Sequence, residues 1–216
     1  MNIFASGQPA LVEDIHAVCS EAGYTHNPEL PVYAVFDFHI TDLPEKKNFL
    51  ENISADLIFT TAVPCSATEA ALWAINPSRV VGISPIIGRV VEFAPALQTA
   101  PEVLIKAEQF LRSIGLEIVH VADGPGLVRL RVLCCVINEA IGALAEGVAS
   151  PDDIDTAMKL GANYPFGPIE WADQLTPEVV LAVMRGLQFE YGEDRYRPTP
   201  LLVKKVFAKQ NFVLQE

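Results

Sequence analysis

The first part of the chain alternates between short apolar runs and segments with helical spacing. The apolar runs are residues 2–5, 32–38, 56–63, 79–84 and 90–93, and the helical segments between them are residues 9–23, 43–53 and 66–75. In the first helical segment Leu11, Ile15 and Val18 recur three or four residues apart, as on one face of a helix. Strands that alternate with helices are typical of a parallel sheet covered on both faces. The pattern therefore predicts a doubly wound α/β domain.

From Thr99 onward the pattern is helical, apart from a short strand expected at residues 116–121. The sequence Asp-Gly-Pro-Gly at 123–126 breaks the chain, and the apolar residues 127–146 predict a long, largely buried helix. Three later helices are each indicated by a capping Ser or Thr before a proline at the first helical position. These pairs are Ser150-Pro151, Thr176-Pro177 and Thr199-Pro200. We therefore expect an α/β domain over residues 1–121 and an all-helical domain over residues 122–216.

Composition and charge exclude some classes of protein and of partner. Half of the residues are hydrophobic and the mean hydropathy is +0.28, as in a globular chain. Lys and Arg number 15 against 27 Asp and Glu, so the formal net charge is −12. A field of this sign repels a phosphate backbone, which excludes nucleic acid as an expected partner.

The sequence also carries information on localisation. No uncharged apolar stretch approaches the about 18 residues that a membrane span needs, and the N-terminus lacks the basic and apolar regions of a secretory signal. The four cysteines contain no C-x-x-C pair, and Cys134 and Cys135 are adjacent on a predicted helix. We therefore expect reduced thiols in a cytoplasmic protein without a membrane partner.

The most specific signal lies in the second half of the chain. Residues 123–126, the long apolar helix and residues 150–170, which read SPDDIDTAMKLGANYPFGPIE, strongly resemble the C-terminal domain of the L-3-hydroxyacyl-CoA dehydrogenase family. The resemblance extends over roughly residues 30–212 and more weakly over the first 24. It implies a truncated Rossmann-like parallel sheet domain followed by the helical domain through which the family dimerises. It also implies oxidation of 3-hydroxyacyl-CoA thioesters with NAD, in fatty-acid metabolism.

A Rossmann domain holds the pyrophosphate of a dinucleotide with the fingerprint G-x-G-x-x-G. The resemblance places its three glycines on Gly7, Pro9 and Val12, so only the first is kept. Pro9 lacks a backbone N–H, and Val12 adds a branched side chain where the helix packs on the strand. Residues 24–31 leave room only for a connection, whereas the family has a second strand there that ends in an acid for the adenine ribose.

Residues 35–46 resemble a later strand and loop of the family, with Asp37 and Lys46 at its usual Glu and Lys positions. On this basis Gly7, Asp37 and Lys46 are interpreted as vestiges of a cofactor site. We expect no bound cofactor, because the ancestral NAD site is interpreted as lost. A CoA thioester is the expected ligand.

The resemblance also locates the catalytic positions. The family's catalytic histidine follows a strand, and the matching stretch here is residues 82–88, in which Ser84 replaces the histidine. A serine without an adjacent base cannot act as a general base at neutral pH. The glutamate that orients the histidine corresponds to Glu92. Ser84 and Glu92 are thus the candidate catalytic positions of an altered pair.

The substrate-binding positions of the family differ as well. Its Ser and Thr run corresponds to residues 61–65, so that Cys65 and the following Ser66 are candidate substrate contacts. Leu130 stands where the family has an asparagine, and Arg131 keeps the arginine that follows. Cys65 is read as a packed thiol in preference to a nucleophile. Arg131 is read either as a contact for a CoA phosphate or as part of a structural salt bridge.

No metal site is expected. The four histidines are scattered and form no His-x-x-x-His pair, and no carboxylates cluster at the spacing of metal ligands. They are His16, His26, His39 and His120. The acidic residues of 152–155 lie where a helix dipole favours anions, and Lys159 follows Asp155 by four residues, so they indicate helix stabilisation.

Three functions from different classes stay open. The first is a pseudoenzyme of the family, a CoA-thioester-binding paralogue without ordinary NAD-dependent dehydrogenase activity. The second is an active enzyme of altered chemistry that uses Ser84, Cys65, Glu92 or Asp37, and the NAD-dependent 3-hydroxyacyl-CoA dehydrogenase with an altered site is kept beside it. The third is a structural or regulatory partner of a full-length dehydrogenase. Whether the chain is an enzyme is therefore left open by the sequence.

Overall fold

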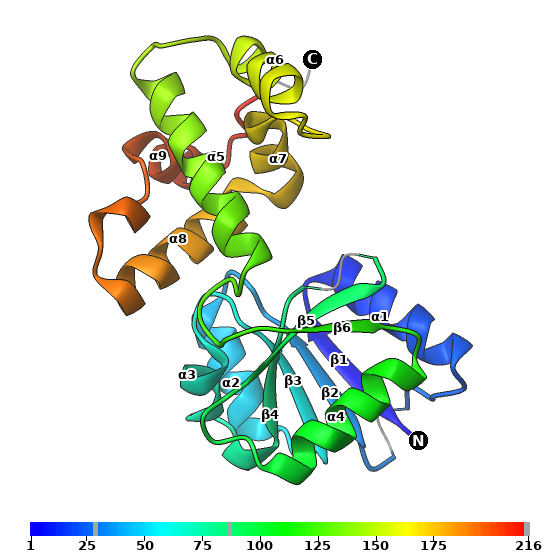
Figure 1. Ribbon diagram of the computed structural model, residues 1–216. Helices are drawn as coiled ribbons and strands as arrows, with labels where there is room; N and C mark the ends of the chain where they lie inside the picture. Colours follow the sequence, from blue (N-terminus) through cyan, green and yellow to red (C-terminus); the bar gives the residue numbers. More distant parts are fainter. Residues whose placement is uncertain (28–29, 86–87, 214–216) are drawn as a thin grey trace. The chain divides into compact units, whose positions relative to one another are not determined.

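The computed structural model describes residues 1–27, 30–85 and 88–213 of the chain (Figure 1). It divides into two compact units, Met1–Val128 and Arg129–Glu216. The division falls after Val128 rather than after residue 121, because the intervening segment is bonded to the first unit. Asp123 accepts from the N–H groups of Ala67 and Thr68, and the Gly126 N–H donates to the Ala62 carbonyl.

The first unit is built on a six-stranded sheet in the order β1-β2-β3-β4-β5-β6. The strands are β1 (Ile3–Gly7), β2 (Ala34–Phe38), β3 (Leu57–Thr61), β4 (Val80–Ile83), β5 (Val90–Pro95) and β6 (Glu117–His120). All neighbouring pairs are parallel except β4 and β5, which are antiparallel. The predicted fold class is confirmed, and the antiparallel pair is the exception to the expected parallel sheet. Residues 84–89 are too few for the crossover that a parallel connection needs.

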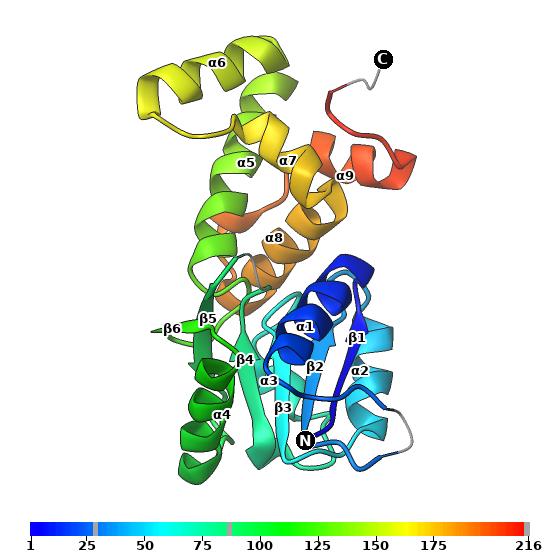
Figure 2. The ribbon, with the colours of Figure 1, turned by 90° about the vertical axis from the view of Figure 1, so that its right-hand side faces the viewer.

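Helices cover both faces of this sheet (Figure 2). Helices α1 (Pro9–Glu21) and α4 (Pro101–Ser113) pack on the face that carries Ala5, Phe36 and Phe59. Helices α2 (Leu43–Asn52) and α3 (Ala67–Ala71) pack on the opposite face with Val35 and Ile58, and a short 3-10 helix follows at Pro77–Arg79. Successive strand residues point to opposite faces, which is why the central strands β2, β3 and β4 are buried at every position.

Strand β1 is an edge strand that pairs directly with β2. Among the described residues between α1 and β2 there is no strand, only an isolated bridge between Asn2 and Thr25. The connection predicted for residues 24–31 is therefore seen in its described part, and residues 28 and 29 lie outside it. Because the strand order runs in sequence without reversal, the sheet lacks the switch point beside which a doubly wound fold binds dinucleotides.

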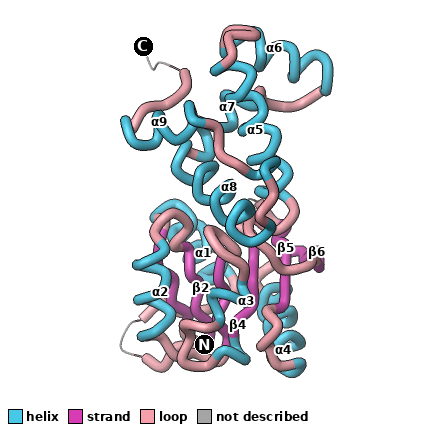
Figure 3. The backbone as a smooth tube through the Cα atoms, turned by 90° about the vertical axis from the view of Figure 1, so that its left-hand side faces the viewer, coloured by secondary structure: helices cyan, strands magenta, loops and turns pink. Residues whose placement is uncertain are grey.

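The second unit is helical, as expected (Figure 3). Its helices are α5 (Arg129–Ala145), α6 (Pro151–Ala162), α7 (Pro168–Leu175), α8 (Pro177–Tyr191) and α9 (Pro200–Ala208), with a 3-10 helix at Asp194–Tyr196. Helix α5 packs against α7, α8 and α9. Its buried residues Cys134, Ile137 and Ile141 recur at helical spacing, which explains the long apolar signal in the sequence.

Two of the three predicted helix caps are confirmed. The Ser150 hydroxyl accepts from the Asp153 N–H, and the Thr199 hydroxyl accepts from the Leu202 N–H. Thr176 precedes Pro177 with a positive φ of 71° and makes no side-chain cap bond, so the prediction of a hydroxyl cap is wrong there. The pattern of Ser or Thr before Pro also missed α7, because a glycine precedes Pro168.

Helix α7 is capped instead by a side chain from α6. The Asp155 carboxylate accepts from the N–H groups of Ile169 and Glu170 at 2.8 and 3.0 Å. Lys159 pairs with Glu170 at 2.6 Å and not with Asp155 as the spacing suggested. A Cβ at Gly167 would lie 2.1 Å from Asp155, so only glycine allows this approach. Asp155 and Lys159, which the sequence predicts to stabilise a single helix, thus connect α6 to α7.

Candidate functional site

A row of polar side chains crosses the carboxyl ends of the first three strands. Ser6 pairs with Asp37 across β1 and β2, and Asp37 pairs with Thr60 across β2 and β3. Residues paired in register point to the same face of a sheet, here the face covered by α2 and α3. The sheet therefore brings together three polar residues that lie more than twenty positions apart in the sequence.

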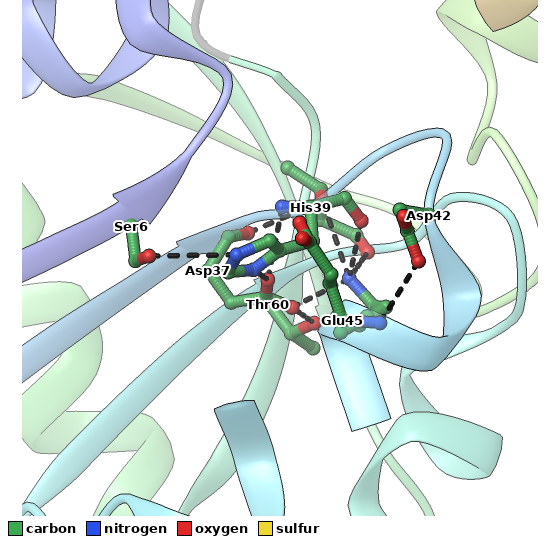
Figure 4. A network of polar contacts seen from close by, with 8 residues as sticks. Ser6, Asp37, His39, Asp42, Glu45 and Thr60 are labelled. Carbon is green, nitrogen blue, oxygen red and sulfur yellow. Dashed lines mark hydrogen bonds and ion pairs between the residues drawn. The ribbon is translucent and has the colours of Figure 1, made fainter. Parts of the chain in front are cut away.

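Asp37 is the centre of this network (Figure 4). Its Oδ2 atom lies 2.5 Å from Lys46 Nζ, and the Thr60 hydroxyl donates to the same oxygen at 2.6 Å. The side chains of Asp37 and Lys46 are fully buried. Burial alone would raise the pKa of Asp37, but the Lys46 ammonium and the hydrogen bonds from His39, Lys46 and Thr60 hold that pKa below its ordinary value. Asp37 is thus an ionised, buried carboxylate.

The Lys46 ammonium is satisfied in the same network. Besides Asp37 it donates to the Thr61 carbonyl at 2.9 Å, with longer contacts to the Thr61 hydroxyl and the His39 carbonyl at 3.4 Å. A buried ion pair of this kind is stable only when its remaining donors and acceptors are hydrogen-bonded. Asp37 and Lys46, both predicted as remnants of a cofactor site, are therefore bonded to one another and turned away from solvent.

His39 extends the network toward the surface. Its backbone N–H and its Nδ1 atom both contact Asp37 Oδ1, at 3.0 and 2.8 Å. Its Nε2 atom lies 3.4 Å from Ser6 Oγ, and its ring packs against Phe49 of α2 at 5.1 Å between centroids. The His39 side chain is 10% exposed, whereas Asp37 is fully buried. The ring therefore connects a buried carboxylate with a partly exposed hydroxyl.

Ser84 and Glu92, the predicted catalytic positions, lie side by side on the antiparallel strands. The Glu92 N–H donates to Ser84 Oγ at 2.9 Å, and the Ser84 N–H donates to the Glu92 carbonyl at 3.1 Å. The Glu92 carboxylate accepts from the Val128 N–H at 3.2 Å. Both residues are buried, at 3% and 5% exposed. Residues 86 and 87 of the motif that contains Ser84 lie outside the described part of the chain.

Cys65 and Ser66 precede α3, and both have local roles. Burial raises the pKa of the Cys65 thiol to about 12, so it is a packed thiol and not a thiolate nucleophile at neutral pH. The Ser66 hydroxyl accepts from the Glu69 N–H at 3.3 Å as the cap of α3. Asp123 accepts from the first two N–H groups of that helix, those of Ala67 and Thr68. The Ser66 hydroxyl and the first N–H groups of α3 are thus already hydrogen-bonded within the protein.

Leu130 and Arg131 belong to the second unit. Leu130 is 3% exposed on the packed side of α5 and offers no polar atom. Arg131 donates to the hydroxyls of Tyr191 and Tyr196, and its guanidinium lies 4.5 Å from the centre of the Tyr191 ring. Burial lowers the pKa of Arg131, but the tyrosine hydrogen bonds outweigh this effect and raise it. The sequence predicts for Arg131 either a contact with a CoA phosphate or a structural salt bridge, and neither interpretation includes this pairing with two tyrosines.

The first turn fits a dinucleotide only in part. Gly7 has φ of 119°, and a Cβ there would lie 2.2 Å from the Phe38 backbone, so the glycine is required for the approach of β1 to β2. The Gln8 N–H donates to the Phe38 carbonyl, Pro9 has no N–H, and the Val12 N–H donates to Gln8. These groups do not form the usual glycine-rich cradle for a pyrophosphate.

The part of the chain that the structure describes contains no cluster of three or more His, Cys, Asp or Glu side chains suited to hold a metal ion. None of its helices has both the length and the apolar character to cross a membrane.

Comparison with known proteins relates the chain to one family. The family described as "3-hydroxyacyl-CoA dehydrogenase, C-terminal domain" matches residues 126–212. The chain is 41% identical over 133 residues to 3-hydroxyadipyl-CoA dehydrogenase of Escherichia coli, a match that covers 62% of this chain and 28% of the relative. It is 38% identical over 158 residues to 3-hydroxybutyryl-CoA dehydrogenase of Clostridioides difficile, covering 71% and 56%. Residues 126–212 thus match the C-terminal domain of the 3-hydroxyacyl-CoA dehydrogenase family, and a larger part of the chain is similar to relatives named as dehydrogenases of this kind.

Solved structures agree at the level of the fold. The crystal structure of (S)-3-hydroxybutyryl-CoA dehydrogenase from Ralstonia eutropha matches with a TM-score of 0.83 and 22% identity, covering 100% of this chain and 99% of that one. The match confirms the α/β domain and the helical domain. By contrast, the chain spans only 28% and 56% of the two curated relatives named above.

The expectation of no cofactor is wrong. The family match and the names of the relatives are those of dehydrogenases, the class that the resemblance describes as NAD-dependent. The prediction rested on Pro9, Val12 and the missing strand, and these features concern how a dinucleotide is held. They do not establish that none is used. NAD is therefore the cofactor that the matched family implies.

Sequence reasoning missed the contribution of Ser6 and His39. The sequence shows His39 only as one of four scattered histidines and gives Ser6 no role. A signal is present, because Ser6 directly follows the predicted run 2–5 and His39 directly follows the predicted run 32–38. The carboxyl ends of neighbouring parallel strands meet at one edge of a sheet. The missing information was that β1 and β2 are direct neighbours, which the shortened connection brings about.

Proposed function

We propose that the chain is a CoA-thioester-binding member of the family in which oxidation of the 3-hydroxyl group is much slower than in its relatives. The observation that carries the proposal is the family match over residues 126–212, together with a fold that is similar along the whole chain to a dehydrogenase of a CoA thioester. The relatives are named for 3-hydroxyacyl-CoA substrates, and this class is the one proposed here.

The slow oxidation is proposed from the Ser84 and Glu92 pair. The resemblance places Ser84 at the position of the proton-accepting histidine, and its oxygen accepts from the Glu92 backbone N–H. A serine hydroxyl in this setting lacks the basicity to accept the substrate proton near neutral pH. Loss of a general base lowers a rate by about 10²- to 10⁴-fold. NAD, when bound, would supply the hydride acceptor.

A second candidate is an ordinary NAD-dependent 3-hydroxyacyl-CoA dehydrogenase with an altered site. The names of the curated relatives favour it, since all of those quoted above are dehydrogenases. It differs from the first proposal in one measurable quantity, which is the rate of hydride transfer.

The experiment combines binding with turnover. Thermal unfolding is followed with acetoacetyl-CoA, free CoA and NADH in turn, because a ligand of the native state raises its stability. NADH oxidation with acetoacetyl-CoA is then measured at saturating ligand. Stabilisation by acetoacetyl-CoA with turnover at least about 100-fold below that of a family dehydrogenase is the expected result. Full turnover would favour the second candidate, and no stabilisation by any CoA compound would contradict both.

We also propose a homodimer formed through the helical unit, in the cytoplasm. Large apolar side chains of that unit are exposed, including Leu160 at 83%, Phe189 at 83% and Phe207 at 74%. Removal of such side chains from water would stabilise the association of two copies. The four free cysteines are consistent with a reducing compartment. Sedimentation equilibrium tests the dimer, and a monomer at micromolar concentration would contradict it.

A further inference from the structure

The network at the carboxyl ends of β1 and β2 contains a serine that contacts a histidine, and the histidine in turn contacts an aspartate. Ser6 Oγ lies 3.4 Å from His39 Nε2, and His39 Nδ1 lies 2.8 Å from Asp37 Oδ1 (Figure 4). The first distance is at the long end for a hydrogen bond. Contacts between a nucleophile and its base are often looser without substrate and tighten when it binds. Such triads are recognised by geometry and by the role of each group.

The contacts fix which nitrogen of His39 carries the proton. An ionised carboxylate only accepts hydrogen bonds, so Nδ1 must be the donor to Asp37. In a neutral imidazole the other nitrogen is then a lone-pair acceptor, and Nε2 is the atom that faces Ser6. The low pKa of Asp37, which Lys46 and Thr60 help to maintain, keeps the carboxylate ionised and the ring in this tautomer. His39 is thus set to accept the proton of Ser6.

The position of Ser6 also suits a nucleophile. It lies at the end of β1 and is followed at once by a tight turn at Gly7 and then by α1, which begins at Pro9. Gly7 fixes the end of β1 against β2, because no Cβ fits between Gly7 and Phe38. Ser6 and His39 are partly exposed, whereas Asp37 is buried.

We propose that Ser6, His39 and Asp37 form a nucleophilic site that hydrolyses an activated acyl ester. The substrate class, a CoA thioester, rests on the proposed function above. Ser6 Oγ attacks the thioester carbonyl carbon while His39 Nε2 takes the hydroxyl proton. The C–S bond then breaks, and the thiolate leaves with that proton as the CoA thiol. Water hydrolyses the acyl-serine with His39 again as the base, which releases the carboxylic acid and restores Ser6.

A covalent probe tests the nucleophile without any need for CoA binding. A fluorophosphonate reacts with an activated serine, which displaces fluoride from phosphorus. The intact mass should rise by one adduct, and peptide mapping should place it on Ser6. Ser6→Ala should abolish the adduct, and His39→Gln should slow its formation by about 10²-fold or more. Ser20→Ala and His120→Gln change exposed residues of the same types outside the network and should leave the rate unchanged.

The expected result is labelling confined to Ser6, with loss of the absorbance of the acetoacetyl-CoA thioester in the wild type but not in Ser6→Ala. Ser6→Ala removes a single hydroxyl, and circular dichroism confirms that both variants fold. Absence of a Ser6 adduct in a protein that binds acetoacetyl-CoA overturns this inference and leaves the proposed function standing. A Ser6 adduct without CoA binding or thioester loss contradicts the proposed function and the substrate class, but keeps the nucleophile.

Discussion

The buried ion pair between Asp37 and Lys46 gives the sharpest prediction on stability. Lys46→Met removes the ammonium and keeps most of the volume of the side chain. It leaves the Asp37 carboxylate fully buried with hydrogen bonds from His39 and Thr60 but without its countercharge. We therefore expect Lys46→Met to lower the free energy of unfolding of the α/β unit by a large amount.

The magnitude follows from the burial of both partners. Breaking a buried pair by removing one member costs about 3–5 kcal/mol, because an uncompensated charge is left in the interior. For a chain of this size about 1 kcal/mol lowers Tm by about 2–4 °C, so the expected fall is about 6–20 °C. The matched control is Lys47→Met on the same helix. Lys47 and Glu51 are 3.8 Å apart and about half exposed, so its loss should cost less than about 1 kcal/mol.

The assay is urea unfolding followed by tryptophan fluorescence. The chain has two tryptophans, Trp73 in the first unit and Trp171 in the second, so a Trp171→Phe background leaves a reporter of the α/β unit. The midpoint should shift for Lys46→Met at unchanged slope, which identifies a change in stability. Losses for Lys46→Met and Lys47→Met within about 1 kcal/mol of one another would show that the buried pair does not stabilise the unit as proposed.

Four further predictions concern single features. Because the folded-state pKa of Asp37 is lowered from 3.8, its contribution to stability is complete above that value and is lost as the pH falls through the lowered pKa; acid titration of unfolding should show this loss in the wild type and not in Lys46→Met. Gly7→Ala should destabilise by more than Gly23→Ala in urea unfolding, since both have positive φ but only Gly7 faces backbone at 2.2 Å; equal losses would contradict the close approach. Iodoacetamide followed by peptide mapping should modify Cys135 before Cys65 and Cys19, because burial raises the pKa of the latter two to about 12; faster reaction of Cys65 would be evidence against its packed state. Asp155→Ala should cost about 1–2 kcal/mol by removing the cap of α7, whereas Asp152→Ala should cost about 0.5 kcal/mol; thermal unfolding of the two variants compares them, and equal effects would rule out the cap.

The fold was largely accessible from the sequence because local and tertiary signals agree. The apolar runs that predicted strands are buried on both faces, and the predicted segment 127–146 coincides closely with α5. The exceptions depend on contacts that the sequence does not contain. Asp155 reads as a helix-dipole residue until α7 folds onto it, and the hydroxyl of Thr176 makes no cap because its backbone has a positive φ.

The candidate site was less accessible. The resemblance supplied Asp37, Lys46, Ser84 and Glu92, and the structure brings them together in two pairs. It could not supply the link from Asp37 through His39 to Ser6, because that link depends on β1 lying next to β2. The inference of a lost cofactor failed for a related reason. Missing motif residues describe one way of holding a ligand and carry no information on other ways.

The most direct test of CoA-thioester binding is calorimetric titration of the full chain with acetoacetyl-CoA, with free CoA as the comparison. We expect saturable binding of the thioester, and weaker binding of free CoA, which lacks the acyl group. The Tm of thermal unfolding of the same samples should then rise with ligand concentration. Absence of both heat and stabilisation at millimolar thioester would contradict the claim that this chain is a CoA-thioester-binding member of its family.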